Sequence, residues 1–146
     1  MKTTHIICIA SHKGGVGKTT SAATLGSLLS SSGKKTLLVD LDAQRNLTST
    51  FIGARNKPGR TLYEAFCEGT DIPVFAIREN LDIVPSSLDM GALDTVIASR
   101  IQRESILARL LRPVAESYDF ILLDCPSQMG IITVNAFTAA TSLVVP

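Results

Sequence analysis

Residues 5–10, HIICIA, and residues 13–20, KGGVGKTT, form the stretch of sequence that decides the fold. The first part is a short apolar run rich in β-branched side chains, which predicts a strand buried on both faces. The second part is rich in glycine, and apolar side chains recur after it at helical spacing, which predicts a helix over 18–32 that Gly33 ends. A strand, a glycine-rich turn and a helix in this order are the setting of a phosphate-binding loop, or P-loop.

The residue types in this loop suit the binding of nucleotide phosphates. Glycines have no Cβ, so their backbone N–H groups can turn inward and approach phosphate oxygens closely. The start of the helix adds unpaired N–H donors and the positive end of the helix dipole. We expect Lys18 to reach the β- and γ-phosphates of ATP and the Thr19 hydroxyl to bind Mg²⁺. The general P-loop pattern begins with glycine, where this chain has His12. The residues expected to contact the nucleotide are Lys13, Gly14, Gly15, Val16, Gly17, Lys18, Thr19 and Thr20.

The rest of the chain alternates between predicted strands and predicted helices. Strands are expected over 36–40, 81–84, 119–124 and 142–145, and helices over 46–53, 61–68, 88–99, 102–111 and 131–140. Pro113 is expected to end or kink the helix before it. This alternation predicts an α/β fold of the P-loop NTPase type, a mostly parallel sheet of about five strands with helices on both faces.

Composition and charge narrow the class of protein. The chain has 146 residues, enough for one domain with a substantial core, and its net charge of +1 gives no general attraction to nucleic acid or to an anionic membrane. The apolar run near the N-terminus is too short for a signal peptide, and no run approaches the roughly 20 apolar residues of a membrane helix. Cys8, Cys67 and Cys125 are far apart in the sequence, which fits reduced thiols. We therefore expect a soluble, cytoplasmic protein that does not bind membranes.

Three carboxylates are candidates for work on the nucleotide. Asp40 and Asp42 come at the carboxyl end of a predicted strand, and the alternation of side chains along a strand puts them on the same face. Ligands of open α/β sheets bind beyond the carboxyl ends of the strands, so both should lie near the phosphate loop. Asp124 ends the apolar run FILL, which has the form of a Walker B strand whose Asp holds Mg²⁺ through water. The sequence thus predicts a metal site made by Thr19, Asp40 and Asp124.

The blocks of sequence around these residues resemble one family. KGGVGKTT, with a lysine at the head of the loop, resembles the signature of the deviant-Walker ATPases, which include ParA, MinD, the nitrogenase iron protein and arsenite-pump ATPases. Three further blocks are similar to ParA in particular: LLVDLDAQRN at 37–46, LDIVPSS at 81–87, and YDFILLDCPS at 118–127 with Asn135 in the helix that follows. The resemblance covers nearly the whole chain, from residue 5 to residue 146.

This resemblance implies an Mg²⁺-dependent ATPase that works as an ATP-dependent dimer switch in partitioning plasmid, chromosome or mobile-element DNA. It implies that Asp42 positions the attacking water and that Lys13 reaches across a nucleotide-sandwich homodimer to the partner's ATP, with Lys18 as the third catalytic residue. A ParB-like partner protein is expected. We also expect residues 1–146 to be one nucleotide-binding domain truncated at its C-terminus, with non-specific DNA bound through the missing part. The chain departs from the residues common in the family at Ala43, Arg45 and Gln128, where Pro, Gly and Ser are frequent.

Other functions could use some of the same residues. A MinD-like positioning ATPase would need a C-terminal amphipathic helix, and residues 42–46 favour ParA over it. A nucleotide-dependent dimerisation module with negligible turnover stays open. An iron–sulfur protein would need two converging cysteines per subunit, and Cys8 and Cys67 are expected to lie apart from Cys125. The arginines that could form a DNA patch would point around a helix rather than along one stripe, which favours a solvated face; they are Arg100, Arg103, Arg109 and Arg112.

Overall fold

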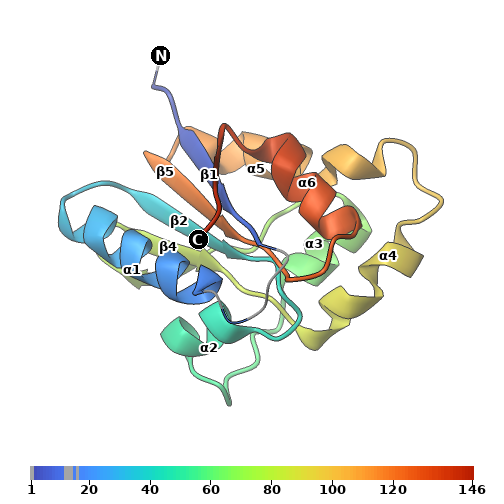
Figure 1. Cartoon of the computed structure of the whole chain (residues 1–146), viewed down its shortest axis with the longest axis horizontal. Coiled ribbons are helices and arrows are strands. Elements are labelled where there is room, and N and C mark those ends of the chain that lie inside the picture. The colour runs from blue at the N-terminus through green and yellow to red at the C-terminus, as the bar shows by residue number, and fades with distance from the viewer. Residues whose placement is uncertain (1, 12–14, 16) are drawn as a thin grey trace.

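Strands and helices alternate along the chain in the structure, a computed structural model that describes residues 2–11, 15 and 17–146 (Figure 1). The strands are β1 (His5–Ile9), β2 (Thr36–Asp40), β3 (Phe75–Arg78), β4 (Leu81–Val84), β5 (Phe120–Asp124) and β6 (Ser142–Val144). The α-helices are α1 (Lys18–Ser31), α2 (Asn46–Ile52), α3 (Leu62–Glu68), α4 (Leu93–Val96), α5 (Ile106–Ala115) and α6 (Ile131–Ala139). Two 3₁₀ turns, η1 (Leu88–Ala92) and η2 (Arg103–Ser105), precede α4 and α5. None of these helices is both long and apolar enough to cross a bilayer.

The described strands form one six-stranded sheet in the order β3-β4-β2-β5-β1-β6. Five of them are parallel, and β3 pairs antiparallel with β4 at one edge. The register places Asp40 of β2 and Ile9 of β1 level with Asp124 of β5. The carboxyl ends of the three central strands therefore meet where β1 leads into the phosphate loop, as the sequence predicts.

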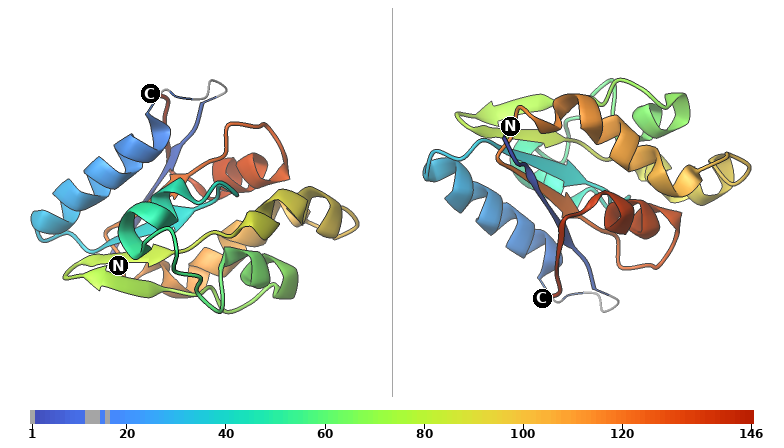
Figure 2. Two further views of the ribbon diagram at one scale, coloured as in Figure 1. Left: turned by 90° about the horizontal axis from the view of Figure 1, so that it is seen from below. Right: turned by 90° about the horizontal axis from the view of Figure 1, so that it is seen from above.

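Helices cover both faces of the sheet. α1 and α2 pack on one face, and α3, α4, α5 and α6 pack on the other (Figure 2). Side chains alternate along β2, so Leu38 faces α1 while Leu37 and Val39 face the second group of helices. A Cβ built at Gly26 would lie 2.7 Å from Cδ2 of Leu38, so any larger residue here would have to displace the Leu38 side chain. The close approach fixes α1, and the residues at its start, against the sheet.

Three local details differ from the prediction. The sequence does not predict β3, because this short edge strand is mostly exposed and lacks the apolar pattern of a buried one. Residues 88–99 do not form a single helix: η1 passes into α4, which ends at Val96, and Gly91 lowers the helical propensity of this segment. Pro113 does not end the helix before it, since α5 continues to Ala115. Pro113 lies in the last turn of α5, so its ring and missing N–H affect only that turn of the helix.

Candidate nucleotide-binding site

The loop between β1 and α1 carries the predicted phosphate contacts, and the structure describes part of it. The predicted contacts Lys13, Gly14 and Val16 lie outside the described residues. Gly15 and Gly17 have φ angles of 74° and 86°, in the left-handed region that glycine adopts without strain. Among the described residues nothing lies within 4 Å of a Cβ built at either position, so the backbone conformation favours glycine at both.

The start of α1 presents the next three predicted contacts. Lys18 is only 8% exposed, so its side chain lies inside the protein at the edge of the site rather than in bulk solvent. Thr19 is half-buried, and Thr20 is exposed. A buried lysine at the first position of a helix that follows a glycine turn is the arrangement that a P-loop uses to bind terminal phosphates.

Asp124, at the end of β5, forms the other half of the predicted metal site. Its side chain is buried, and its Oδ2 accepts a hydrogen bond of 2.8 Å from the Thr19 hydroxyl. Its Oδ1 is also buried and has no hydrogen-bond partner among the residues that the structure describes. Burial raises the pKa of Asp124 to about 7, against the opposing effects of the Thr19 hydrogen bond and the Lys18 charge.

This pair of residues fits Mg²⁺. A buried carboxylate oxygen without a partner is costly unless a cation or an ordered water meets it. Mg²⁺ takes oxygen ligands, binds one or two carboxylates, and completes its shell with waters and substrate phosphates. Within the described ranges no group of three or more His, Cys, Asp or Glu could hold a metal ion, so nucleotide and water would have to supply the remaining ligands. Thr19 and Asp124 are the residues that would hold the ion.

Asp40 has a different set of contacts from Asp124. Its Oδ1 accepts the backbone N–H of Asp42 at 3.1 Å, and its Oδ2 accepts both the N–H and the hydroxyl of Thr48 at 2.8 and 2.6 Å. Burial raises the pKa of Asp40 to about 6, although these hydrogen bonds oppose the shift. The structure thus shows Asp40 holding the start of α2, and the expectation that it also supports the metal stays a prediction.

The hydrogen bonds of Asp40 continue into a network that fixes the loop after β2. The N–H of Ser86 donates to the Thr48 hydroxyl at 2.9 Å, and the Ser86 hydroxyl donates to the Asp42 carbonyl at 2.7 Å. Arg45 has φ of 58°, a left-handed conformation, and its guanidinium donates to the carbonyls of Ser86 and Asn56. Glycine, which the resemblance leads us to expect at this position, would adopt this conformation without strain. No local pattern in the sequence marks Thr48 or Ser86 as a site residue, although the block at 81–87 contains Ser86.

Asp42 lines a cavity of about 330 Å³. Its Oδ1 accepts the N–H of Gln44 at 3.0 Å, an Asx turn that orients the carboxylate. The other walls of the cavity are residues 126–130, which follow β5, and residues of η1 and α4 that include Asp94. The structure therefore brings Asp42 and the loop after Asp124 to one cavity. A half-buried carboxylate beside such a cavity can accept a hydrogen bond from a water molecule.

Two of the three cysteines lie in contact, so the expectation that Cys8 lies apart from Cys125 is wrong. Cys8 in β1 and Cys125 after β5 are fully buried, with their Sγ atoms 3.2 Å apart. They pack in the core among apolar side chains beneath the site, while Cys67 lies on α3. A pair of cysteines in a closed core has no room for an iron–sulfur cluster, so the preference for packed thiols stands.

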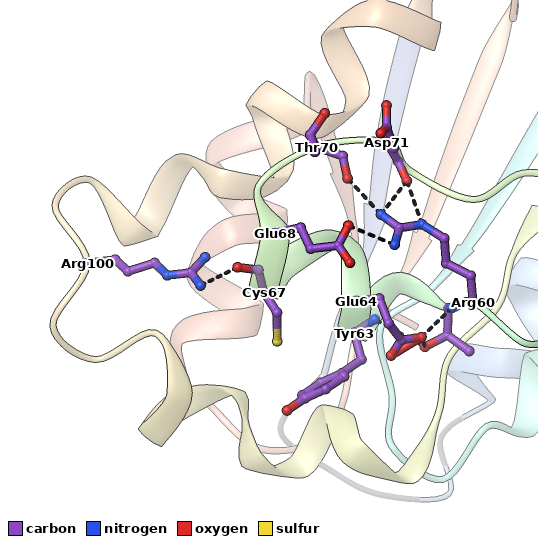
Figure 3. Close-up of polar contacts among 9 residues, drawn as sticks. Arg60, Tyr63, Glu64, Cys67, Glu68, Thr70, Asp71 and Arg100 are labelled. Atoms are coloured by element: carbon purple, nitrogen blue, oxygen red, sulfur yellow. Dashed lines mark hydrogen bonds and ion pairs between the residues drawn. The ribbon is translucent and has the colours of Figure 1, made fainter.

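Three of the four arginines that could form a DNA patch, Arg100, Arg103 and Arg109, make local contacts. Arg100 donates to the carbonyl of Phe66 and, as Figure 3 shows, to the carbonyl of Cys67, both at the end of α3. On the other side of α3, Arg60 pairs with Glu68 at 2.8 Å and also donates to the Thr70 and Asp71 carbonyls, as Figure 3 shows. Arg103 and Arg109 donate to acceptors in residues 98–105. These side chains stabilise turns and helix ends, so the prediction of a solvated face is wrong for Arg100.

Comparison with known sequences gives one family and several relatives. A family model described as an AAA domain matches residues 4–146. The chain is 38% identical to the sporulation initiation inhibitor protein Soj of Bacillus subtilis (strain 168) over 145 residues, which are 97% of this chain and 57% of Soj. It is 38% identical to the chromosome partitioning protein ParA of Myxococcus xanthus (strain DK1622) over 146 residues, 97% of this chain and 51% of that protein. The chain therefore spans little more than half the length of these relatives.

Solved structures agree with the fold. Cobyrinic acid a,c-diamide synthase from Mycobacterium smegmatis, crystallised with ADP and magnesium, matches with a TM-score of 0.92 and 31% identity over 99% of this chain and 60% of that one. The same enzyme has also been solved with an ATP analogue and magnesium. These matches confirm the predicted α/β fold of the P-loop type.

Proposed function

Because the chain belongs to the ParA family of AAA-domain proteins, we propose that it binds ATP with Mg²⁺, hydrolyses it, and acts as an ATP-dependent dimer switch in DNA partitioning. The observation that carries this proposal is the contact between Thr19 and Asp124 beside the buried Lys18. Thr19 and Asp124 would provide two oxygen ligands for Mg²⁺, and Lys18 next to Thr19 would provide a cation for the terminal phosphates. Phosphoryl transfer requires both in one place. The nucleotide and magnesium in the M. smegmatis enzyme, which has the same fold, support it further.

The residues have separate tasks in this proposal. Phosphoryl transfer needs positioning and neutralisation of charge more than covalent help from the protein. Lys18 and the backbone N–H groups of the loop bind the β- and γ-phosphates, and Thr19 and Asp124 hold Mg²⁺, which supplies further positive charge when bound. Asp42 accepts a hydrogen bond from the attacking water and orients it toward the γ-phosphate. Asp40 holds the backbone of Asp42 beside the attacking water, and it also supports the metal shell.

Dimerisation and DNA belong to the same proposal for the whole protein. Lys13 reaches the ATP of the partner in a nucleotide-sandwich homodimer, as the resemblance of its loop implies. A ParB-like protein stimulates hydrolysis, and DNA binds outside residues 1–146, whose net charge of +1 gives no general attraction to phosphates. Because the chain covers little more than half of its relatives, these partners are proposed for the whole protein only.

The proposal is tested by nucleotide binding and phosphate release with the purified chain. We expect a fluorescent ATP analogue to bind and Mg²⁺ to strengthen its binding, since Thr19 and Asp124 are in place to hold the ion. Phosphate release should accompany binding. Binding without release would favour the dimerisation module with negligible turnover, and no Mg²⁺-dependent binding at all would overturn the proposed function.

A further inference from the structure

Asp94, in α4, lies against the start of α6. Its Oδ1 accepts a hydrogen bond of 3.1 Å from the backbone N–H of Ile131, the first residue of α6. A Cβ built at Gly130 would lie 3.0 Å from Oδ2 of Asp94, so the carboxylate packs directly on this glycine. The contact joins two elements whose contacting residues are 37 positions apart in the sequence.

Asp94 supplies a cap that α6 does not provide for itself. The residue before α6 is Gly130, which is extended and has no side chain that could accept a hydrogen bond. The first N–H groups of a helix have no partner within the helix, and an Asp, Asn, Ser or Thr at the N-cap often satisfies one of them. Here the acceptor comes from another element. Its negative charge also suits the positive end of the helix dipole.

This cap holds the loop that follows the proposed metal ligand. Residues 126–130 run from β5 to α6 and line the 330 Å³ cavity together with Asp42 and Asp94. The hydroxyl of Thr133, in α6, donates to the carbonyl of Gln128 at 3.0 Å, which ties the loop to α6. Asp94 in turn ties the start of α6, where this loop ends, to α4.

We propose that Asp94 is a positioning residue of the nucleotide site, which holds residues 126–130 ready for the γ-phosphate and so sets the preference for ATP over ADP. This inference rests on the proposed function. In P-loop NTPases the loops beside Mg²⁺ become ordered through contacts with the γ-phosphate. A loop that is already held loses less conformational entropy when ATP binds. ADP lacks the γ-phosphate, so its affinity does not depend on the loop in this way.

The test compares three variants of the chain. Asp94→Ala removes the acceptor, Asp94→Asn keeps an oxygen at the Oδ1 position, and Asp89→Ala removes another exposed carboxylate from the preceding turn. Isothermal titration calorimetry gives the Kd for ADP and for a non-hydrolysable ATP analogue, both with Mg²⁺. Hydrogen–deuterium exchange follows residues 126–132.

Asp94→Ala should weaken binding of the ATP analogue about fivefold, the loss expected for a helix cap, and leave the affinity for ADP within about twofold. Exchange should become faster in residues 126–132 and not in α1. Asp94→Asn and Asp89→Ala should behave like the unchanged chain.

Other outcomes separate this inference from the proposed function. Equal losses for ADP and the ATP analogue would indicate a general loss of structure and would overturn the positioning role. The role would also be wrong if Asp94→Asn failed as Asp94→Ala does, or if Asp94→Ala kept the full preference for ATP. If the unchanged chain bound neither nucleotide, the proposed function would fall, and this inference with it.

Discussion

The hydroxyl of Thr19 donates a hydrogen bond of 2.8 Å to Oδ2 of Asp124, which joins the first turn of α1 to the end of β5. The two residues are 105 positions apart, so the fold, rather than the local sequence, creates the contact. It leaves Oδ1 of Asp124 buried and without a partner in the described part of the chain.

Thr19→Val removes the hydroxyl while keeping the shape of the side chain. We expect the gain in nucleotide affinity that Mg²⁺ provides to fall about tenfold, because a ligand is lost and a buried carboxylate loses its donor. Thr19→Ser keeps the hydroxyl and is the matched control. Titration of the ATP analogue at several Mg²⁺ concentrations measures the effect, and an equal loss in both variants would speak against metal binding by Thr19.

Lys18→Ala should remove most of the affinity for ATP, roughly a hundredfold, because the phosphates lose a buried cation and keep only backbone donors. Lys34→Ala, which removes an exposed lysine beyond the other end of α1, is the control. Circular dichroism checks that both variants fold. Near-normal binding of a fluorescent ATP analogue by Lys18→Ala would contradict the assignment of the phosphate loop.

Asp42→Ala should lower turnover about a hundredfold or more while ATP and Mg²⁺ still bind, because it removes the group that orients water and no phosphate contact. Single-turnover phosphate release measures the first effect and calorimetry the second. If the variant no longer binds ATP with Mg²⁺, then Asp42 belongs to the metal site and its assignment to hydrolysis is wrong.

The pH dependence of Mg²⁺ binding should follow Asp124. Burial raises its pKa from the usual 3.8 to about 7, so between these values the folded chain holds a proton that the unfolded chain has lost. Its contribution to the free energy of unfolding therefore decreases as the pH rises through this window. The same proton competes with Mg²⁺, so the affinity for the ion should fall roughly fivefold to tenfold over the pH unit below about 7. Asp124→Asn should lose this dependence and keep only the shallower profile that comes from the nucleotide and from Asp40, whose pKa is raised to about 6.

Lys13 should act on the nucleotide of the partner subunit, a prediction that comes from the resemblance alone. Lys13→Ala leaves a chain with its own Asp42 and Lys18, and Asp42→Ala leaves a chain that still offers Lys13. Mixed in the ATP-bound dimer, the two variants should recover part of the activity that neither has alone. No recovery would mean that Lys13 serves its own nucleotide, since each mixed dimer would then have two defective sites.

The sequence predicts the parts of the site that depend on local pattern. The strand over 36–40 is identified to the residue, because a run that is buried on both faces leaves a continuous apolar signal. Asp42 and Asp124 are found for the same reason, since each follows such a run. The glycines of the loop are recognised from their spacing, and Gly15 and Gly17 have the left-handed conformation that explains them.

The rest depends on contacts between distant segments, which leave no local signal. Thr48, Ser86 and Asp94 act through hydrogen bonds to residues 8, 44 and 37 positions away. The contact between Cys8 and Cys125 spans 117 positions. An exposed edge strand such as β3 is missed for a related reason: its stability comes from pairing with β4, not from the pattern of its own side chains.

The two edges of the sheet differ in their readiness to accept another strand. β3 has an irregular register between Ala76 and Arg78 and an exposed charge at Arg78, features that hinder pairing with a further strand. β6 is parallel to β1, and Leu143, Val144 and Val145 at this edge are all at least 40% exposed. A further strand, whether from the same protein or from another molecule, would therefore pair with β6 rather than with β3.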